Sequence, residues 1–593
     1  MPEIIDRRKT KSEFVDEPAS LAGSAQGSHS DGMPDTDCVS GDDARELRDG
    51  AEQADAGAPV SAVDDETHVA VARSTALMSA ATLISRVTGL VRTWAMAFAL
   101  GNSLITSAYQ VANNMPNVVF DLVAGGLLGA AFIPVYLLEK ERKGDAGGNA
   151  FANNLLNLTV IVLGLLSIIS SVFAPQLIAT QTFTVGEFDE VVSLSVAFFR
   201  IFAFQIVFYG ISGIVTAVLN ANRVYFLPAL APALNNICVI VSFFLFIPLS
   251  ATNQQLAILV LGVGTTLGVA VQAVIQIPAL IKQGFKFDLH VNLKDPALIE
   301  ALKIALPTML YIVGTLVAFS CRNAFSLQVG DNGPSTLLYA WTWYQLPYGV
   351  VAVSLSRALF TEMGEAVAKD DWDALRELVR TGISGNLLLI IPLGGIMIAL
   401  STPLMELFQA GAFGQGDVLY VSHVLAAWLV SLPFYAVLMF MYNVFAALRK
   451  FMHFAVTSTL MVVVQCLLYF FLCRPETLQL QGVPVADFIY YAACCVILVV
   501  VLQRMVGSFD LRSVLWSTAR VLLATVVGVV IAYFIASFLP IQMGMLGGFV
   551  RLVVAGGIGL VAIFALCALL RVPQMGIVTN LIRKIAGRFR RAS

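Results

Sequence analysis

The sequence predicts an all-α membrane protein with about fourteen transmembrane helices, formed by two six-helix repeats and two further C-terminal helices. Of the 593 residues, 58% are hydrophobic and 13% are charged, whereas a typical soluble domain is about 25% charged. The mean hydropathy is +0.80. From residue 75 onward, apolar runs follow one another with little between them, and each is long enough to cross a bilayer core, which needs about 20 residues of helix.

The fourteen predicted spans follow these runs directly. They cover residues 75–99, 104–138, 151–174, 187–220, 227–248, 255–281, 297–328, 335–368, 381–403, 416–447, 452–473, 483–503, 515–538 and 547–570. Several exceed the minimum length, which predicts helices that tilt or extend beyond the membrane.

Basic residues in the short loops predict the orientation, because lysine and arginine accumulate on the cytoplasmic side. Every second loop is basic, and these loops carry Lys140, Arg142, Lys143, Arg223, Lys282, Lys286, Lys294, Lys369, Arg376, Arg380, Arg449, Lys450, Arg504 and Arg512. The intervening loops have none, except for the loop with Arg474. Both termini are therefore expected in the cytoplasm, and residues 572–593 are expected to form a basic cytoplasmic tail.

Residues 1–72 are expected to form a disordered acidic tail. Residues 1–70 hold 17 of the 39 acidic residues and 6 of the 36 basic ones, so their net charge is −11 and that of the remainder is +8. This segment is rich in small and acidic residues and cannot bury enough apolar area to offset the entropy of ordering. Its start lacks the apolar region of a secretory signal, so we expect it to stay in the cytoplasm.

A weak internal duplication divides the apolar part of the chain. Pro175 matches Pro403 at an offset of 228 residues, Arg223 matches Arg449 at 226, and Pro116 matches Pro347 at 231. Nearly constant offsets predict an N-terminal half over residues 73–282 and a C-terminal half over 283–506, with two additional helices over 507–571. Such repeats are typical of transporters whose halves rock around a central site.

Neither a metal site nor a nucleotide site is predicted. Seven of the eight cysteines lie in or beside apolar runs without ligand spacing, and the eighth is Cys38 in the tail. The five histidines are scattered, and the sequence has neither a phosphate-binding loop nor a nucleophile elbow. We therefore expect no catalytic residue, no cofactor, no bound metal and no nucleic-acid partner.

Charged side chains inside the spans are the first candidate site residues, because each costs about 2.5–3.5 kcal/mol on insertion scales unless it faces a cavity or a partner. Arg86 and Arg92 lie in the first span, six residues and about 240° apart around a helix, so they would line adjacent walls of a cavity. The alternative is that both anchor the helix at the membrane interface.

The second span carries an unusually polar stretch around Pro116. It contains Asn113, Asn114, Asn117 and Asp121 and is followed by a pair of glycines, Gly125 and Gly126. Proline and glycine free backbone groups that are tolerated in lipid only where protein or water supplies partners, so the stretch is expected to line a cavity. The alternative is hydrogen bonding between helices at a structural kink.

Later spans add three candidates. Arg322 and Asn323 lie near the outer end of the seventh span, and Gln345 lies near Pro347 in the eighth. Arginines facing a water-filled cavity suit a phosphate-bearing substrate, because guanidinium groups make bidentate contacts with phosphate oxygens. For Arg322, the alternative is a side chain that reaches the outer surface water.

Several of these segments resemble the MurJ/MviN family of lipid II flippases, in the multidrug/oligosaccharidyl-lipid/polysaccharide exporter superfamily. The resemblance rests on SAATLISRVTGLVR (79–92), SAYQVANNMPNVVFDLVAGGLLGAAFIPV (107–135), LNANRVYFLPALAPALNN (219–236) and LFQAGAF (407–413). It covers roughly residues 73–570, and the form of two segments is similar to the actinobacterial branch.

The resemblance implies a multi-pass protein of the bacterial cytoplasmic membrane that flips lipid II, the undecaprenyl-pyrophosphate-linked peptidoglycan precursor, by alternating access. It implies that Arg86 and Arg92 correspond to two family arginines and that helices 13 and 14 form a groove for the lipid tail. Membrane lipids are expected partners, and cell-wall synthesis proteins remain an open addition. Four charged family positions are uncharged here, at Ser107, Phe120, Gly125 and Thr342, and Arg322 is expected to supply the missing charge.

Three alternatives to lipid II transport stay open on the sequence. A flippase for another polyprenyl-linked glycan would share the fold and the cationic cavity. A cation-coupled multidrug exporter of the same superfamily would carry acidic cavity residues, of which the first half offers Asp121. A scaffold for cell-wall enzymes would use the acidic tail for docking.

Overall fold

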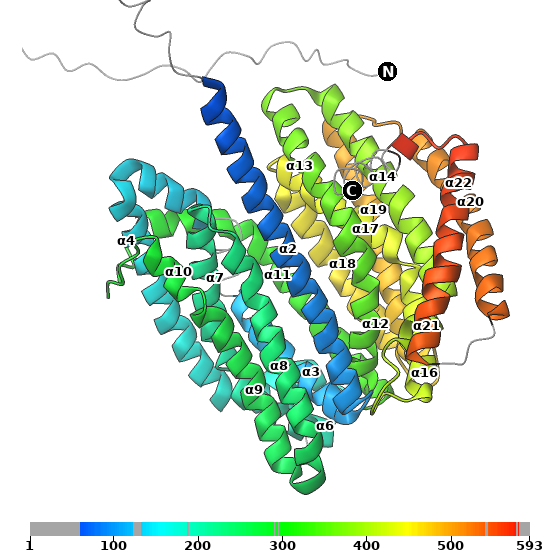
Figure 1. Cartoon of the computed structure of the whole chain (residues 1–593), viewed down its shortest axis with the longest axis horizontal. Helices are drawn as coiled ribbons and strands as arrows, with labels where there is room; N and C mark the ends of the chain where they lie inside the picture. Colours follow the sequence, from blue (N-terminus) through cyan, green and yellow to red (C-terminus); the bar gives the residue numbers. More distant parts are fainter. Residues whose placement is uncertain are drawn as a thin grey trace, which may run out of the picture. The chain divides into compact units, whose positions relative to one another are not determined.

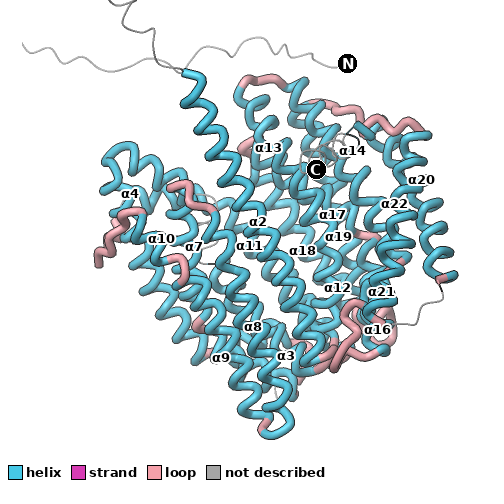
Figure 2. The backbone as a smooth tube through the Cα atoms, viewed as in Figure 1, coloured by secondary structure: helices cyan, strands magenta, loops and turns pink. Residues whose placement is uncertain are grey.

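Among the residues that the structure describes, every regular element is a helix (Figure 2). The structure is a computed structural model, and it describes residues 60–122, 132–186, 189–289, 291–294, 296–539, 544–576 and 579. Most of the predicted acidic tail, the pair Gly125 and Gly126, and most of the basic tail lie outside the described residues. The chain divides into two compact units, Met1–Val71 and Ala72–Ser593, and the description below concerns the second.

Three helices of the first half begin at a polar side-chain cap. The bounds of all helices of this half are α2 Val60–Leu100, α3 Leu104–Phe120, α4 Phe132–Val172, α5 Ala174–Thr182, α6 Glu190–Phe202, α7 Gln205–Ala221, α8 Phe226–Thr252, α9 Gln254–Val274 and α10 Ile277–Lys282. Ser103, Asp189 and Asn253 cap α3, α6 and α9 by accepting a backbone N–H with the side chain, as N-cap residues do. Gly144 has φ +70° and interrupts α4.

The second half and the two additional helices continue the series. Their bounds are α11 Pro296–Val329, α12 Gly333–Pro347, the π-helical turn η3 Tyr348–Ala352, α13 Val353–Ala368, α14 Trp372–Ala399, α15 Ser401–Glu406, α16 Gln415–Leu429, α17 Leu432–Ala447, α18 Phe451–Leu472, the short 3₁₀ turn η4 Gln479–Gln481, α19 Gly482–Val506, α20 Leu511–Phe538, α21 Met545–Arg551, the π-helical turn η5 Leu552–Gly556 and α22 Gly557–Leu569.

Twelve of the fourteen predicted spans correspond to described helices with the length and apolarity of a membrane span. Ten are single helices, and two are bent pairs, α6 with α7 at 44° and α16 with α17 at 52°. The other two predicted spans, 104–138 and 335–368, correspond to α3 with the start of α4, and to α12, η3 and α13. The multi-pass helical architecture is confirmed, and the count of fourteen stays a prediction.

The two predicted halves share backbone irregularities at corresponding positions. The bent pair α6 and α7 recurs as α16 and α17, and each pair ends at an arginine with positive φ, Arg223 at 62° and Arg449 at 54°. Pro116 and Pro347 lie near the ends of α3 and α12, and both are followed by π-helical backbone. Matching irregularities at matching positions support two six-helix repeats.

Each half packs mainly on itself. In Figure 1 the blue to green helices α4, α7, α8 and α9 form one bundle, and the yellow-green to orange helices α13, α14 and α17–α19 form another. Within the first, α8 packs on α9 and α4 on α7. Within the second, α11 packs on α18, α18 on α19 and α14 on α17. The additional helices α20 and α22 pack on each other and on α14.

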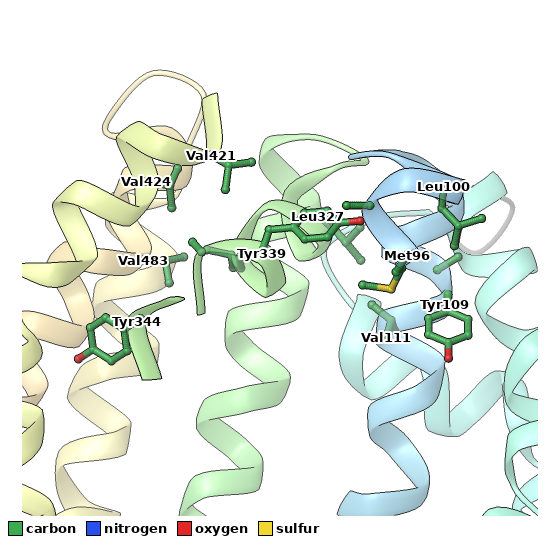
Figure 3. Close-up of a cluster of buried hydrophobic side chains, with 14 of the residues drawn as sticks. Met96, Leu100, Tyr109, Val111, Leu327, Tyr339, Tyr344, Val421, Val424 and Val483 are labelled. Carbon is green, nitrogen blue, oxygen red and sulfur yellow. The ribbon is translucent and has the colours of Figure 1, made fainter. Parts of the chain in front are cut away.

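The buried core shows where the two halves share their packing. One large cluster runs from Met96 and Tyr109 of the first half to Tyr339 and Trp428 of the second without interruption, and Figure 3 shows part of it. Elsewhere the cores are separate. One lies in the first half around Tyr136 and the start of α11, and another lies in the second half with the first residues of α20. The shared cluster lies at the C-terminal end of α2, which we call the sealed end.

A buried ion pair attaches the additional helices to the second half. Arg551 of α21 lies 3.1 Å from both carboxylate oxygens of Glu406 in α15, and their side chains are 13% and 1% exposed. Gly548 lets the helices approach this closely, because a Cβ there would lie 2.6 Å from the Pro403 carbonyl oxygen. The pair fixes α21 against α15 at the sealed end.

Removing one partner of this pair should destabilise the protein. A buried charge without its counter-ion costs about 3–5 kcal/mol, so we expect Glu406→Leu and Arg551→Met each to lower the thermal unfolding midpoint of the purified protein in detergent. The double variant should recover most of the loss, because well-packed apolar residues often replace a buried pair at little cost. Equal losses in the single and double variants would show that packing, not charge, holds α21 in place.

Candidate functional site

Small polar side chains join the halves at the sealed end. Asn102, which follows α2, donates to Thr336 of α12 at 2.9 Å and accepts from the Ser335 hydroxyl. The Tyr339 hydroxyl donates to the Gly101 carbonyl oxygen at 2.9 Å. Ser107, one of the uncharged family positions, accepts from the Ser335 backbone N–H at 3.3 Å. We call these contacts the seal.

Backbone also crosses the seal. The Ala412 N–H donates to the Phe98 carbonyl oxygen at 2.9 Å. The approach depends on glycines, because a Cβ on Gly411 would lie 2.3 Å from that same oxygen and a Cβ on Gly101 would lie 2.6 Å from the Ala412 oxygen. Both glycines have positive φ, +58° and +66°, which L-residues rarely adopt. The segment LFQAGAF thus forms part of the seal.

Asn323 belongs to the same region. Its amide donates to Gln181 of α5 at 2.7 Å, and Gln181 in turn donates to Ser320 at 2.9 Å. Both Asn323 and Gln181 are buried. Asn323 was predicted as a substrate contact, and in this conformation its amide joins α11 to α5.

Away from the seal, α2 becomes progressively exposed. Ala95, Met96 and Ala97 are at most 5% exposed, whereas Leu83 is 63% and Val87 is 53% exposed. Asn236 of α8 holds the middle of α2 by donating to the Thr88 hydroxyl at 3.1 Å. The two candidate arginines therefore lie where α2 leaves the shared core.

Arg86 is exposed and reaches across to the second half. Its Nη1 donates to the Gly349 carbonyl oxygen at 2.8 Å. Gly349 lies in η3, the π-helical turn that follows Pro347 and interrupts the regular helical hydrogen bonding. A cation that bridges the halves by one bond to a main-chain oxygen retains other guanidinium donors for an anion.

Arg92 lies six residues deeper and is partly buried. Its charge acts on the hydroxyls of Tyr109 of α3 and Tyr209 of α7, and Asn117 and Asp121 act on the same Tyr209 hydroxyl. Three of the predicted site residues of α2 and α3, Arg92, Asn117 and Asp121, therefore act on Tyr209. Asn113 contributes a backbone carbonyl oxygen that accepts from Asn117 of the same helix at 3.4 Å.

Asn114 of α3 is the fifth polar residue of this group. Its amide nitrogen is buried and has no hydrogen-bond partner within the described residues. Buried amides are normally paired, so this unpaired one, three residues before Asn117 on α3, is a polar group available to a ligand.

Arg322 lies in a different place. It lines a cavity of about 220 Å³ whose lining residues all come from the second half. Its guanidinium carbon lies 5.0 Å from the centre of the Phe319 ring and 5.4 and 5.6 Å from those of Trp341 and Trp428, within the range of cation–π attraction. The structure therefore separates Arg322 from the arginines of α2.

A buried acid balances Arg322, and the sequence analysis missed it. Asp487 of α19 is 0% exposed. It accepts from Trp428 at 2.9 Å, from Gln465 at 2.7 Å and from the Tyr469 hydroxyl, and the charge of Arg322 acts on it. The signal was present, because an aspartate inside the apolar run PVADFIYYAACC is expensive unless it is partnered.

Gln345 and Thr342 complete the comparison with the predicted site. Gln345 is exposed and lies beside the Tyr435 hydroxyl, and Tyr435 lines the Arg322 cavity. The Thr342 hydroxyl donates to the Leu338 carbonyl oxygen of its own helix at 2.9 Å. The predicted residues thus form two groups, one on α2 and α3 and one around Arg322 and Gln345, while Asn323 joins the seal.

Comparison with known proteins identifies related sequences. The family model described as lipid II flippase MurJ matches residues 96–553. A probable lipid II flippase MurJ of Buchnera aphidicola subsp. Schizaphis graminum is 28% identical over 339 residues, which is 57% of this chain and 65% of the relative. Lipid II flippase MurJ of Burkholderia cenocepacia is 25% identical over 365 residues, 61% of this chain and 70% of the relative. The matched segment thus spans about two thirds of these relatives.

Solved structures show the same fold. Lipid II flippase MurJ in an inward closed conformation superposes with a TM-score of 0.66 at 21% identity, covering 82% of this chain and 97% of the other. An inward-facing multidrug resistance MATE family transporter superposes with a TM-score of 0.61 at 16% identity, covering 72% and 95%.

The seal predicts a specific cross-link. Side-chain atoms of Asn102 and Thr336 lie within hydrogen-bond distance, so cysteines at these positions in a background without native cysteines should form a disulfide under mild oxidation. The linked peptides can be quantified by mass spectrometry. The pair Leu83→Cys and Leu337→Cys is the matched control, because Leu83 is 63% exposed and Leu337 is 4% exposed in the shared core. No link in the first pair, or equal linking in both, would contradict the sealed arrangement.

Proposed function

Because the chain belongs to the lipid II flippase MurJ family, we propose that it moves lipid II from the inner to the outer leaflet of the bacterial cytoplasmic membrane by alternating access. The observation that carries the mechanism is the asymmetry between the ends of the two halves. At one end they share a core and a hydrogen-bonded seal, and elsewhere they keep separate cores. Halves that meet firmly at one end can rock about that contact.

The charge distribution supports an orientation for this state. Lys140, near the Gly144 break in α4, and the turns that carry Arg223 and Lys450 lie at helix ends opposite the seal, and basic residues at such ends favour the cytoplasm. The seal then faces the outside, both termini face the cytoplasm, and the protein is in an inward-facing conformation.

The headgroup is proposed to bind first at the arginines of α2. The pyrophosphate of lipid II is a dianionic, oxygen-rich group, and guanidinium groups hold such groups by paired, charge-assisted hydrogen bonds. Arg86 is exposed beyond the seal, and Arg92 lies deeper among Tyr109, Tyr209 and Asn117. Asn113, Asn114 and Asp121 supply further polar groups, of which the Asn114 amide nitrogen is unpaired in this conformation.

The second half is proposed to contribute Arg322 and Gln345. Both belong to the region around the 220 Å³ cavity and Tyr435. Asn323 would reach the substrate once its bond to Gln181 breaks, that is, when the seal opens. In this scheme the headgroup passes from the α2 arginines toward groups that the seal now covers.

The lipid tail is proposed to remain in the bilayer beside α20 and α22. These helices expose long rows of apolar side chains, among them Leu523 at 60%, Val526 at 61% and Val561 at 70%. Their close contact at Gly528, where a Cβ would lie 2.2 Å from Ile563, makes them one unit. Cell-wall synthesis proteins remain candidate partners, and the proposal involves no bond-making step.

Replacing the α2 arginines should impair transport without loss of insertion. Each charge-assisted hydrogen bond contributes about 1.5–3 kcal/mol, so we expect Arg86→Ala and Arg92→Ala each to slow lipid II translocation by about tenfold or more, and the Lys variants to lose less. A leaflet-specific lipid II accessibility assay after depletion of the native protein measures this. Arg142→Ala is the control, since Arg142 is exposed on α4 away from the site. Normal transport by the double Ala variant would contradict the assignment.

The role of Arg322 can be separated from its charge balance with Asp487. Arg322→Gln alone should lower both stability and transport, because it leaves a buried carboxylate without its neighbouring cation. Adding Asp487→Asn should restore the unfolding temperature. If Arg322 binds the headgroup, the double variant remains stable and fails to transport in the same accessibility assay. If the double variant transports normally, Arg322 serves only to balance Asp487.

A further inference from the structure

The segment between the two halves is an extended strap. It follows α10 at Lys282 and precedes α11 at Pro296, and its described residues from Phe285 to Asn292 have no helical structure. The strap lies along α4, to which it is bonded, and Phe285 at its start is buried in the core of the first half. We define the strap as residues 285–294.

Three asparagines of α4 hydrogen-bond the strap backbone. Asn153 donates to the Lys286 carbonyl oxygen at 2.7 Å and accepts from the Asp288 N–H at 3.1 Å. Asn154 donates to the Asn292 carbonyl oxygen at 3.0 Å and accepts from its N–H at 2.7 Å. Asn157 donates to the Asp288 carbonyl oxygen at 2.6 Å. The side-chain amides thus donate to and accept from the strap backbone, as the backbone of a neighbouring β-strand would. The backbone groups of Lys286, Asp288 and Asn292 that they bond therefore need no water as a partner.

The strap turns a row of apolar side chains outward. The alternate residues Phe287, Leu289, Val291 and Leu293 are 54%, 96%, 42% and 66% exposed. Lys282, Lys286 and Lys294 flank this row and are exposed as well. An exposed apolar row with basic neighbours is typical of segments that lie in a membrane interface.

The depth of the strap agrees with an interface position. Val172, at the end of α4, lies 19 positions after Asn153, which is about 29 Å along the helix at 1.5 Å per residue. This matches the roughly 30 Å thickness of the hydrocarbon core. The exposed apolar side chains of α4, such as Ile161 at 58% and Leu165 at 58%, continue from the strap toward the sealed end.

We propose that the strap is a lipid-binding element, which inserts its apolar row into the leaflet at the end opposite the seal and places its lysines on anionic headgroups. Non-helical backbone is excluded from hydrocarbon because its polar groups lack partners. The asparagines of α4 remove that obstacle, since they pair the strap and are themselves paired by it. The proposed occupant is the anionic lipid surface, because the sequence 282–294 carries three lysines and one acidic residue. This proposal does not depend on which substrate the protein moves.

Nitroxide accessibility tests the proposal directly. In a background without native cysteines, Leu289→Cys and Leu293→Cys carry the label in the full chain, reconstituted in vesicles with equal parts of phosphatidylglycerol and phosphatidylcholine. We expect both labels to be more accessible to oxygen than to a water-soluble nickel chelate. Asp145→Cys is the matched control, because its side chain is 81% exposed near the Gly144 break, and it should show the reverse order. Greater nickel accessibility at 289 and 293, or exclusion of both reagents as under a protein partner, would overturn the proposal.

Two further variants test its parts. Replacing Lys282, Lys286 and Lys294 by Gln should reduce the depth of the 289 label in phosphatidylglycerol vesicles and leave it unchanged in pure phosphatidylcholine. If the 289 label lies at the same depth in both vesicle types when all three lysines are present, the assignment to anionic lipid is overturned. Replacing Asn153, Asn154 and Asn157 by Leu should move the label toward water, because the strap backbone would then need water as its partner. A label that stays at the same depth in a folded variant would overturn the role of the asparagines.

Discussion

Hydrocarbon offers no hydrogen-bond partners, so each polar group that this chain carries into the membrane must find one within the protein or face a site that supplies one. That constraint explains the partners seen here. Asp487 is surrounded by three donors, and Arg551 is matched to Glu406. The asparagines of α4 pair with the strap backbone. Two of the incompletely paired polar groups, Arg86 of α2 and Asn114 of α3, belong to the proposed headgroup site.

The fold was largely predictable because apolar length and loop charge act on whole segments. Twelve predicted spans correspond to helices of the right length and apolarity, and two of the three landmark pairs of the repeat fall on matching irregularities, most clearly at Arg223 and Arg449. The bends within two of those spans were not predicted. The first, at Ala203–Phe204, lies in apolar sequence without a local breaker, so packing between helices decides the backbone there. The second, at Val430–Ser431, precedes Pro433, which is a local signal for a helix break.

The candidate site was predicted less completely, for two physical reasons. Sequence shows which residues are costly in lipid but not the direction of each side chain, so Arg322 and Asn323, adjacent in sequence, were grouped although they point to different partners. The seal was invisible for the opposite reason. It is made of Asn102, Ser335 and Thr336, small residues at loop ends that carry no charge and resemble ordinary helix caps. Only their positions across the two halves give them a role.

The main-chain bond between Ala412 and Phe98 has an evolutionary consequence. Because both partners are backbone groups, the only substitution at these two residues that removes a bonded group is Ala412→Pro, which lacks the N–H. Few single substitutions at these positions would therefore weaken the seal, whether they are selected by an inhibitor or by adaptation. The accessible substitutions are replacements of Gly101 or Gly411, where any larger residue meets backbone of the other half. Those two positions are where natural variation in the resting conformation of related chains should be sought.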